Sequence, residues 1–307
     1  MDLKQLKYFM HVAELGSYTR AADFLGVAQP LLSRQIRLLE TELRHNLLNR
    51  HGRGVSLTDS GRILLDHCRV IQQQIDAIQE DLSVSTGKLT GHITLGLPPT
   101  VAKLLSVDII KQFHQQLPDA QISIIEGLTS HLQENLQQGK IDMALLYNPA
   151  YSSQLDKQLF YEERLHLIAP KNHALTIPAG GLTAAQLAEL PLIAPSAPNS
   201  FRLLIEEEMA RYNQVPTIRL EINSVEAMLK LVSEGMGYAI LSPGTIELMR
   251  HPESVEVIPI ASPVFTSQLF LATSAKHTLS RTQRQLMRLL QDIAPLLGKT
   301  CPTIATA

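Results

Sequence analysis

Cysteine is nearly absent from the sequence, and this excludes two kinds of architecture. The chain has two cysteines, Cys68 and Cys301. A disulfide framework or a four-ligand zinc site needs more thiols than that. The 11 histidines are scattered, without the spacing that places metal ligands on one element. We therefore expect no metal site and interpret both cysteines as small buried or incidental thiols.

Long apolar runs and export signals are also missing. No stretch of 18 apolar residues is free of charge, and the residues after Met1 lack the order of basic, apolar and small residues that marks a signal peptide. Hydrophobic residues nevertheless make up 45% of the 307 residues, which supplies material for folded cores. The sequence predicts a cytoplasmic globular protein of at least two domains, with no membrane contact.

Recognisable catalytic apparatus is missing as well. The segment Gly235-Met-Gly-Tyr-Ala-Ile lacks the third glycine of the dinucleotide fingerprint, and the sequence contains neither a Walker loop nor a nucleophile elbow. We expect a protein that binds ligands without a cofactor and is not an enzyme. An enzyme is kept as the weaker alternative, because a fold excludes no activity.

The net charge of −2 hides an uneven distribution along the chain. Residues 1–57 carry eight Lys or Arg against five acidic residues, whereas residues 58–85 carry two against five. A small basic head on a mildly acidic body is typical of one nucleic-acid-binding module attached to another domain.

The basic head has the pattern of three helices separated by sharp turns. Apolar residues follow helical spacing in residues 3–15, Gly16 ends that helix, and a short second helix ends at Gly26. A third helix begins near Pro30, with an apolar stripe on one face and polar side chains on the other. This is the helix-turn-helix pattern, which we place at residues 18–37.

Two arginine-rich stretches of the head predict contacts with DNA. Arg34 can donate two hydrogen bonds to guanine and Gln29 can pair with adenine, whereas the other arginines are better suited to phosphates. Residues 47–58 predict two extended stretches around a Gly-rich turn, as in a β-wing. The predicted DNA-contacting residues are Thr19, Arg20, Gln29, Pro30, Ser33, Arg34, Arg37, Arg50 and Arg53.

A long helix follows, capped by Thr58, and its apolar positions alternate in steps of four and three. These positions are Leu64, Cys68, Ile71, Ile75, Ile78 and Leu82. Such a heptad seam covers under three heptads, so it predicts either pairing with a second copy or a stripe that packs on the chain's own core. We expect self-pairing, because two helix-turn-helix units contact twice as many bases as one.

The remainder of the chain predicts a ligand-binding domain. Residues 83–91 are rich in Ser, Thr and Gly and predict a hinge. Beyond the hinge, strands and helices alternate as in parallel α/β sheets. We expect two lobes, formed by about residues 91–162 with 266–300 and by residues 163–265. Two crossing strands would join the lobes around a cleft, as in periplasmic binding proteins.

Several predicted helix starts would bring polar groups to this cleft. Thr100 and Thr129 each follow a predicted strand, and a hydroxyl beside free backbone N–H groups attracts a carboxylate. The same residues need no ligand if they only cap their helices. A third loop would add the donors Ser196, Asn199 and Ser200, an apolar wall from Phe201, and Arg202. Arg202 would either clamp a carboxylate or pair with Glu206.

Several segments together resemble the LysR-type transcriptional regulators, and the resemblance covers essentially the whole chain. The N-terminal segments are Leu6-Lys-Tyr-Phe, Gly16-Ser-Tyr-Thr-Arg-Ala-Ala-Asp-Phe-Leu, Ala28-Gln-Pro-Leu-Leu-Ser-Arg-Gln-Ile-Arg-Leu-Leu-Glu and Leu57-Thr-Asp-Ser-Gly; those in the body are Glu126-Gly, Leu136-Gln-Gln-Gly-Lys-Ile-Asp142 and Leu231-Val-Ser-Glu-Gly-Met-Gly-Tyr. Two departures are Arg44, where the family commonly has Gly, and Leu48, where it commonly has Phe.

This resemblance implies a winged helix-turn-helix domain over residues 1–58, a linker and dimerisation helix with its hinge over 59–90, and an effector-binding domain over 91–307. It also implies a homotetramer on an interrupted palindrome in double-stranded DNA, and a small effector near Thr100 and Thr129. An effector-independent regulator and a solute-binding protein stay open as alternatives, and so does RNA polymerase as a partner. The sequence does not indicate which molecule the effector is.

Overall fold

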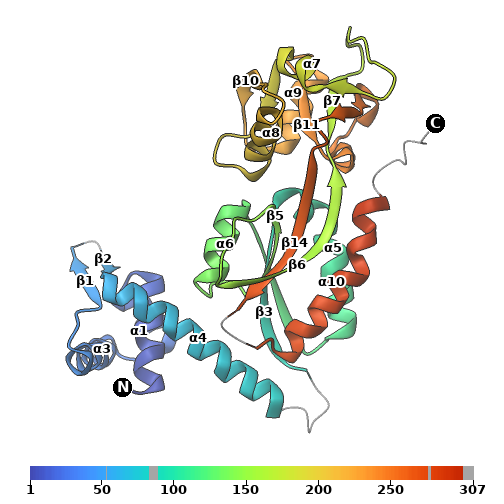
Figure 1. Ribbon diagram of the computed structural model, residues 1–307. Helices are drawn as coiled ribbons and strands as arrows, with labels where there is room; N and C mark the ends of the chain where they lie inside the picture. The colour runs from blue at the N-terminus through green and yellow to red at the C-terminus, as the bar shows by residue number, and fades with distance from the viewer. Residues whose placement is uncertain (53, 83–88, 276–277, 300–307) are drawn as a thin grey trace. The chain divides into compact units, whose positions relative to one another are not determined.

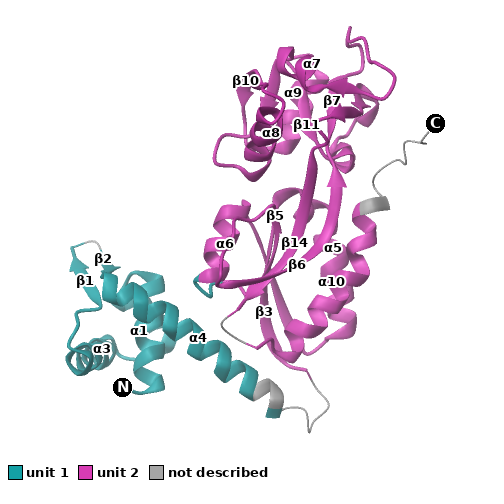
Figure 2. Cartoon of the chain, in the orientation of Figure 1, with its two compact units in different colours: residues 1–86, 138–140 teal, residues 87–137, 141–307 magenta. Residues whose placement is uncertain are grey.

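The computed structural model describes residues 1–52, 54–82, 89–275 and 278–299 (Figure 1). The chain divides into two compact units, residues 1–86 with 138–140, and residues 87–137 with 141–307 (Figure 2). Arg53 and residues 83–88, which include most of the predicted hinge, lie outside the described residues. In the described part of the chain, no helix is both long and apolar enough to span a membrane.

The first unit follows the predicted order of helices and wing strands. Its elements are α1 (Leu3–Leu15), α2 (Tyr18–Leu25), α3 (Gln29–Leu43), β1 (Leu48–His51), β2 (Gly54–Leu57) and α4 (Asp59–Leu82). Gly16 and Gly26 end α1 and α2 with φ angles of 59° and 65°, a left-handed conformation that glycine adopts without strain. The Ser17 side chain caps α2 by accepting a hydrogen bond from the Arg20 backbone N–H.

Thr58 and Gly61, both in the Leu57-Thr-Asp-Ser-Gly segment, allow the start of α4 to pack closely against the chain that leads into β1. The Thr58 hydroxyl accepts a hydrogen bond from the Gly61 backbone N–H at 3.0 Å and donates one to the Asn46 carbonyl at 2.7 Å. A Cβ atom on Gly61 would lie 2.1 Å from the Leu47 carbonyl oxygen. Glycine is therefore required at this position, because α4 approaches the backbone that leads into β1 so closely.

The predicted seam of α4 divides into two halves. Cys68 is 4% exposed in the core of the first unit, and Leu64 and Ile71 pack against that core. Ile78 and Leu82 are 57% and 73% exposed. The first half of the seam therefore packs at least partly on the chain's own core, and pairing of α4 with a second copy stays a prediction.

The second unit contains a five-stranded sheet in the order β4-β3-β5-β14-β6. Its strands are β3 (Gly91–Leu97), β4 (Ala120–Glu126), β5 (Met143–Tyr147), β6 (Leu155–Arg164) and β14 (Thr266–Ser274). The strands β3, β4 and β5 are parallel, as predicted, whereas β14 runs antiparallel to both β5 and β6. The helices α5 (Pro99–Gln116), α6 (Thr129–Gln137) and α10 (Arg281–Lys299) accompany this sheet. Apolar residues of α5 and α10 form one core with it.

The second lobe differs from the prediction in its strand directions. Its elements are β7 (His166–Pro170), β8 (Leu182–Thr183), α7 (Ala184–Glu189), β9 (Leu192–Ala194), α8 (Ser200–Ala210), β10 (Ile218–Glu221), α9 (Val225–Ser233), β11 (Ala239–Leu241), η2 (Pro243–Leu248), η3 (Pro252–Ser254), β12 (Val255–Ile258) and β13 (Ile260–Ser262). The strands β9 and β10 are parallel, but β11 and β12 both pair antiparallel with β7. The lobe is therefore a mixed structure, and the expectation of a second wholly parallel set is wrong.

Two long strands join the lobes. The strands β6 and β14 pair along nine residues of β14, and Figure 1 shows them running side by side from the five-stranded sheet toward β7 and β11. A cavity is lined by residues of both lobes, among them Tyr147 and Asn148 at the end of β5 and the loop that precedes α8.

Candidate functional site

The exposed face of α3 presents the residues that were predicted to contact bases. Gln29, Pro30, Arg34 and Arg37 are exposed, whereas Leu32, Ile36 and Leu39 on the opposite face are fully buried. The side chains of Arg34 and Arg37 have no hydrogen-bond or ion-pair partner among the described residues. The fold therefore places two guanidinium groups on one polar helix face, where they can meet nucleic acid.

Ser33 lies on the same helix but is partly covered. It is half-buried, and its hydroxyl accepts a hydrogen bond from a terminal nitrogen of Arg50 in β1 at 3.1 Å. The same Arg50 nitrogen lies 3.4 Å from the Tyr18 hydroxyl, and the guanidinium carbon lies 4.8 Å from the centre of the Tyr18 ring. Burial raises the pKa of Tyr18, and the nearby Arg50 acts in the opposite direction. Two of the predicted DNA contacts are thus joined to each other.

Thr19 and Arg20 are exposed at the start of α2. Arg20 donates a hydrogen bond to the Leu15 carbonyl, one of the unpaired groups at the end of α1. One of its nitrogens is therefore already used inside the first unit, which leaves Arg20 a weaker candidate for a DNA contact than Arg34.

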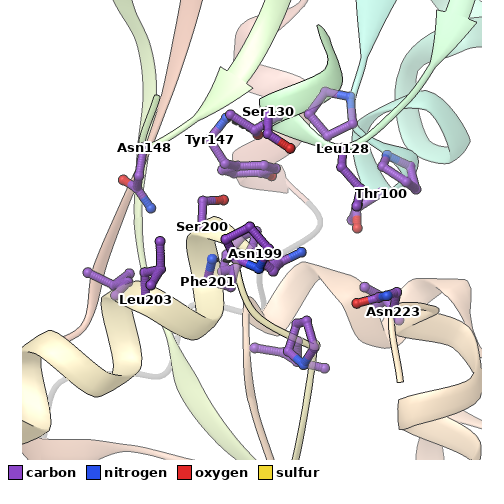
Figure 3. Close-up of a pocket in the computed structure, with 18 of the residues that line it drawn as sticks. Thr100, Leu128, Ser130, Tyr147, Asn148, Asn199, Ser200, Phe201, Leu203 and Asn223 are labelled. Carbon is purple, nitrogen blue, oxygen red and sulfur yellow. Dashed lines mark hydrogen bonds between the residues drawn. The ribbon is translucent and has the colours of Figure 1, made fainter. Parts of the chain in front are cut away.

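A cavity of about 690 Å³ lies within the second unit, at the carboxyl ends of β3 and β4 (Figure 3). Thr100, Tyr147 and Asn148 from the first lobe face Asn199, Ser200 and Phe201 from the second lobe across it. The Phe201 and Tyr147 rings contact each other, with centroids 4.8 Å apart. The volume is within the range of small-molecule sites.

The two predicted threonines both line this cavity, with different surroundings. Thr100 is half-buried at the second residue of α5. Thr129 is the first residue of α6, and its hydroxyl oxygen accepts a hydrogen bond from the Tyr147 backbone N–H at 3.1 Å. Thr129 thus also ties α6 to the end of β5, whereas no described residue hydrogen-bonds to the Thr100 side chain.

The loop before α8 supplies the other predicted lining residues. Ser196, Asn199, Ser200 and Phe201 all line the cavity. The Asn199 side chain caps α8 by accepting from the Phe201 backbone N–H at 2.9 Å. The helices α5, α6 and α8 all begin at the cavity wall, so their unpaired backbone N–H groups converge there.

Arg202 does not belong to the cavity lining, and the idea of a carboxylate clamp is wrong in this structure. Its guanidinium donates to Glu206 at 2.5 Å and to Glu221 at 3.1 Å. Pairing with Glu206 was the alternative suggested by their separation of four residues, and Glu221 of β10 adds a second carboxylate. The described lining includes the acid Glu207 and no Lys, Arg or His.

Sequence reasoning missed Asn148, which follows β5 and lines the cavity. Its side-chain oxygen accepts from the Gln268 backbone N–H at 2.9 Å, and its Nδ2 is buried without a partner among the described residues. A buried donor of this kind is available to a ligand. The signal was a polar residue directly after a buried strand, the same signal that identified Thr100 and Thr129.

A buried carboxyl group lies behind the cavity wall, where the lobes meet. Glu163 of β6 accepts a hydrogen bond from the Ser242 hydroxyl at 2.5 Å and lies beside Tyr147. Burial raises the pKa of Glu163, and the hydrogen bonds with Ser242 and Tyr147 only partly oppose this effect. Burial also raises the pKa of the Tyr147 hydroxyl. Nowhere among the described residues does a cluster of three His, Cys, Asp or Glu side chains have the arrangement to hold a metal ion.

The comparisons with known proteins cover both units. The LysR substrate binding domain matches residues 86–295, and the bacterial regulatory helix-turn-helix protein domain of the lysR family matches residues 3–62. The nitrogen assimilation regulatory protein nac of Escherichia coli (strain K12) is 28% identical over 302 residues, which are 97% of this chain and 98% of that protein. The Hca operon transcriptional activator HcaR of the same strain is 28% identical over 299 residues, 95% and 98% of the two chains.

Solved structures share the fold. Full-length OxyR from Pseudomonas aeruginosa matches with a TM-score of 0.79 and 23% identity, over 96% of this chain and 95% of that one. Full-length CbnR, solved in complex with its target DNA, matches with a TM-score of 0.55 and 21% identity, over 96% and 100%. The helix-turn-helix and substrate-binding matches together span both units, and the chain belongs to the LysR family of DNA-binding transcriptional regulators, which are not enzymes.

Proposed function

We propose that this regulator binds a small carboxylate in the cavity between α5, α6 and α8, and that the bound effector changes how the protein sits on a promoter. The observation that carries the proposal is the convergence of three helix starts on one cavity. A helix start offers unpaired N–H groups and a partial positive charge, and both favour an anion.

The lining also indicates what the rest of the effector is like. Pro98, Leu128, Phe201, Val225 and Met228 give the cavity an apolar part. A flat or short apolar body with one carboxylate, such as an aromatic acid, fits this combination. Without a cation among the described lining residues, the negative charge depends on backbone N–H groups, the Thr100 hydroxyl and Asn148 Nδ2.

A regulator that needs no effector is the second candidate, and specific hydrogen bonds favour it. Thr129 and Asn199 already serve the protein's own backbone at Tyr147 and Phe201. If the polar groups of the cavity serve only to cap helices and to hydrogen-bond to the protein's own backbone, the cavity does not bind an anion. Both candidates share the proposed assembly, a homodimer or homotetramer of cytoplasmic protein on an interrupted palindrome in double-stranded DNA.

Titration calorimetry with paired ligands separates the two candidates. We would titrate the full chain with a panel of small aromatic and aliphatic carboxylates, each beside its uncharged amide. We expect at least one carboxylate to bind and its amide to fail. Thr100→Val should weaken binding about tenfold, because it removes one hydrogen bond to a charged group. Thr176→Val, on an exposed loop of the second lobe, is the matched control.

Three results would count against the proposal. If the amide binds as well as the carboxylate, the site does not recognise an anion. If a carboxylate binds tightly while the DNase footprint and the bend angle of the promoter complex do not change, the ligand is not an effector. Binding that survives Thr100→Val unchanged would place the ligand elsewhere.

Selection of genomic fragments by the full chain tests the DNA site. We expect an interrupted palindrome among the winning fragments. Arg34→Ala should lose about 1 to 3 kcal/mol of preference for the selected sequence over a scrambled one, since a bidentate contact to guanine is lost. Equal binding to both sequences by the unchanged protein would remove α3 as the reading element.

A further inference from the structure

Arg50 makes three contacts that its expected role as a phosphate ligand does not require. It extends from the wing strand β1 and is exposed, yet its guanidinium lies over the ring of Tyr18 in α2, at 4.8 Å. One terminal nitrogen lies 3.4 Å from the Tyr18 hydroxyl and 3.1 Å from the Ser33 hydroxyl of α3. A terminal guanidinium nitrogen carries two hydrogens, so this nitrogen is fully used.

The Tyr18 ring is a fixed support for this contact. Tyr18 is 8% exposed and belongs to the core of the first unit, which also contains Leu32 and Ile36 of α3. An arginine that lies over a buried ring and donates to a hydroxyl has few other conformations available. The arrangement therefore links the wing, α2 and α3 through one side chain.

We infer that Arg50 is a positioning residue for DNA reading: it holds Ser33 and the start of α3 relative to the wing, and it does not itself neutralise a phosphate. The inference rests on the DNA-binding activity of the family, and it reassigns a residue that the sequence alone places among the phosphate contacts.

The direction of the hydrogen bond also defines what Ser33 can offer. A hydroxyl has one hydrogen and two lone pairs, and in this structure one lone pair accepts from the charged Arg50. That contact polarises the hydroxyl and makes its own hydrogen a better donor. Ser33 is thereby prepared to donate to an acceptor on DNA, such as a phosphate oxygen, guanine N7 or thymine O4.

The salt dependence of binding distinguishes a positioning residue from a phosphate contact. Each phosphate that a cation neutralises adds about 0.9 to the slope of log K against log salt concentration. We would measure fluorescence anisotropy of the full chain on its selected duplex from 50 to 200 mM salt. Arg50→Ala should lower affinity about tenfold without changing the slope, because it removes charge-assisted contacts inside the protein. Arg37→Ala is the matched control and should reduce the slope by about 0.9 per contacting protomer.

Two further variants test the link to Ser33. Arg50→Lys keeps the charge but loses the planar, two-hydrogen contact, so it should behave like Arg50→Ala. Ser33→Ala and the Ser33→Ala/Arg50→Ala double variant complete a cycle, in which the double variant should lose little more affinity than the worse single variant. Tyr18→Phe keeps the ring and should change affinity less than about threefold, since the contact to the ring remains.

The outcomes separate cleanly. If Arg50→Ala reduces the slope as much as Arg37→Ala and Arg50→Lys restores it, Arg50 contacts a phosphate and the inference is wrong. Additive losses in the Ser33 cycle would also overturn it. Thermal unfolding of each variant shows whether the head is still folded. If the unchanged protein does not bind its selected duplex more tightly than a scrambled one, the proposed DNA recognition is wrong. This result is obtained before any Arg50 variant is compared.

Discussion

Arg44 ends α3 in a backbone conformation that is unfavourable for any residue except glycine. Its φ is 58°, and its N–H donates to carbonyl groups of the last helical turn, at Glu40 and Thr41. Gly, which the resemblance to the family leads one to expect at this position, would adopt this conformation without strain. A Cβ atom in the left-handed region costs about 1 kcal/mol.

Arg44→Gly should therefore raise the free energy of unfolding of the head by about 1 kcal/mol. Arg44→Ala is the matched control, because it removes the charge and keeps the Cβ atom. Urea unfolding followed by circular dichroism gives both values. Equal stability of the two variants would mean that the positive φ at position 44 costs no free energy. Any effect of having Arg instead of Gly at this position would then come from the arginine side chain alone.

Glu163 makes the stability of the second unit depend on pH. Burial raises its pKa in the folded protein, so the folded state favours the protonated carboxyl more than the unfolded chain does. The unfolded chain releases this proton near pH 4.5, the ordinary value for glutamate. As pH rises from there through the raised pKa of the folded state, Glu163 therefore destabilises the fold progressively.

Glu163→Gln should remove this dependence, because glutamine keeps an oxygen to accept from Ser242 and carries no charge. We expect a higher thermal midpoint than the unchanged protein at pH 7.5 and the same midpoint at pH 4. Glu162→Gln, at the exposed neighbouring position in β6, controls for the loss of a surface charge. A stabilisation that is equal at both pH values would have another cause.

At the scale of elements, local signals predicted the helices well and the strand pairing less well. The glycine stops of α1 and α2 are encoded by single residues, Gly16 and Gly26, and the structure confirms them. Two crossing strands between the lobes are expected from the sequence, but the bounds of β6 are not, because its sequence is mostly polar and Leu155 is its one buried residue. It is defined by pairing with β14, whose residues lie more than 100 positions further along the chain. The antiparallel pairing of β11 and β12 with β7 has the same long-range origin.

The sequence predicted the site residues that follow buried strands. It did not predict the roles of residues whose contact partners lie on other elements. Thr100, Thr129 and Ser200 line the cavity as expected. Arg202 was ambiguous because its partner Glu221 lies on a different element, which no local pattern reveals. The role of Arg50 depends on Tyr18 and Ser33, which come from two other elements. Such contacts arise from packing, and one sequence without structure does not specify them.

The two halves of α4 give a sharper test of self-pairing than the whole seam. Ile71 packs on the head's core, so a charge there would unfold the head as well as disturb an interface. Ile78→Asp with Leu82→Asp changes exposed positions only. If these residues pair with a second copy, the dimer of the double variant should have a dissociation constant at least ~tenfold higher, because two apolar side chains no longer bury their surface in the interface. Sedimentation velocity measures this constant.

Ile63→Asp is the control for this experiment. Ile63 is also an exposed apolar residue of α4, at 62%, but it lies outside the heptad positions. It should leave the association unchanged. Association that is equally strong in the Ile78→Asp/Leu82→Asp variant would remove the second half of α4 from the interface.

At the scale of the whole molecule, separate cores predict separate unfolding. The core of residues 6–71 belongs to the first unit, and the cores around the five-stranded sheet and the second lobe belong to the second unit. Cooperative unfolding follows shared packing, so calorimetry of the full chain should resolve two transitions. Each transition can be assigned by a substitution confined to one unit.

Gly61→Ala identifies the transition of the head. Alanine within a helix normally stabilises it, but at this position the new Cβ atom would lie 2.1 Å from the Leu47 carbonyl oxygen. Relief of that clash requires α4 to move away from the wing, and we expect a loss of about 2 kcal/mol or more, as for other strained backbone positions. Only one transition should fall in temperature. Glu163→Gln at pH 7.5 should raise only the other. A single transition that responds to both substitutions would mean that the two units unfold as one, and an effector in the second unit could then act on the head by stabilising the whole chain instead of by moving its parts.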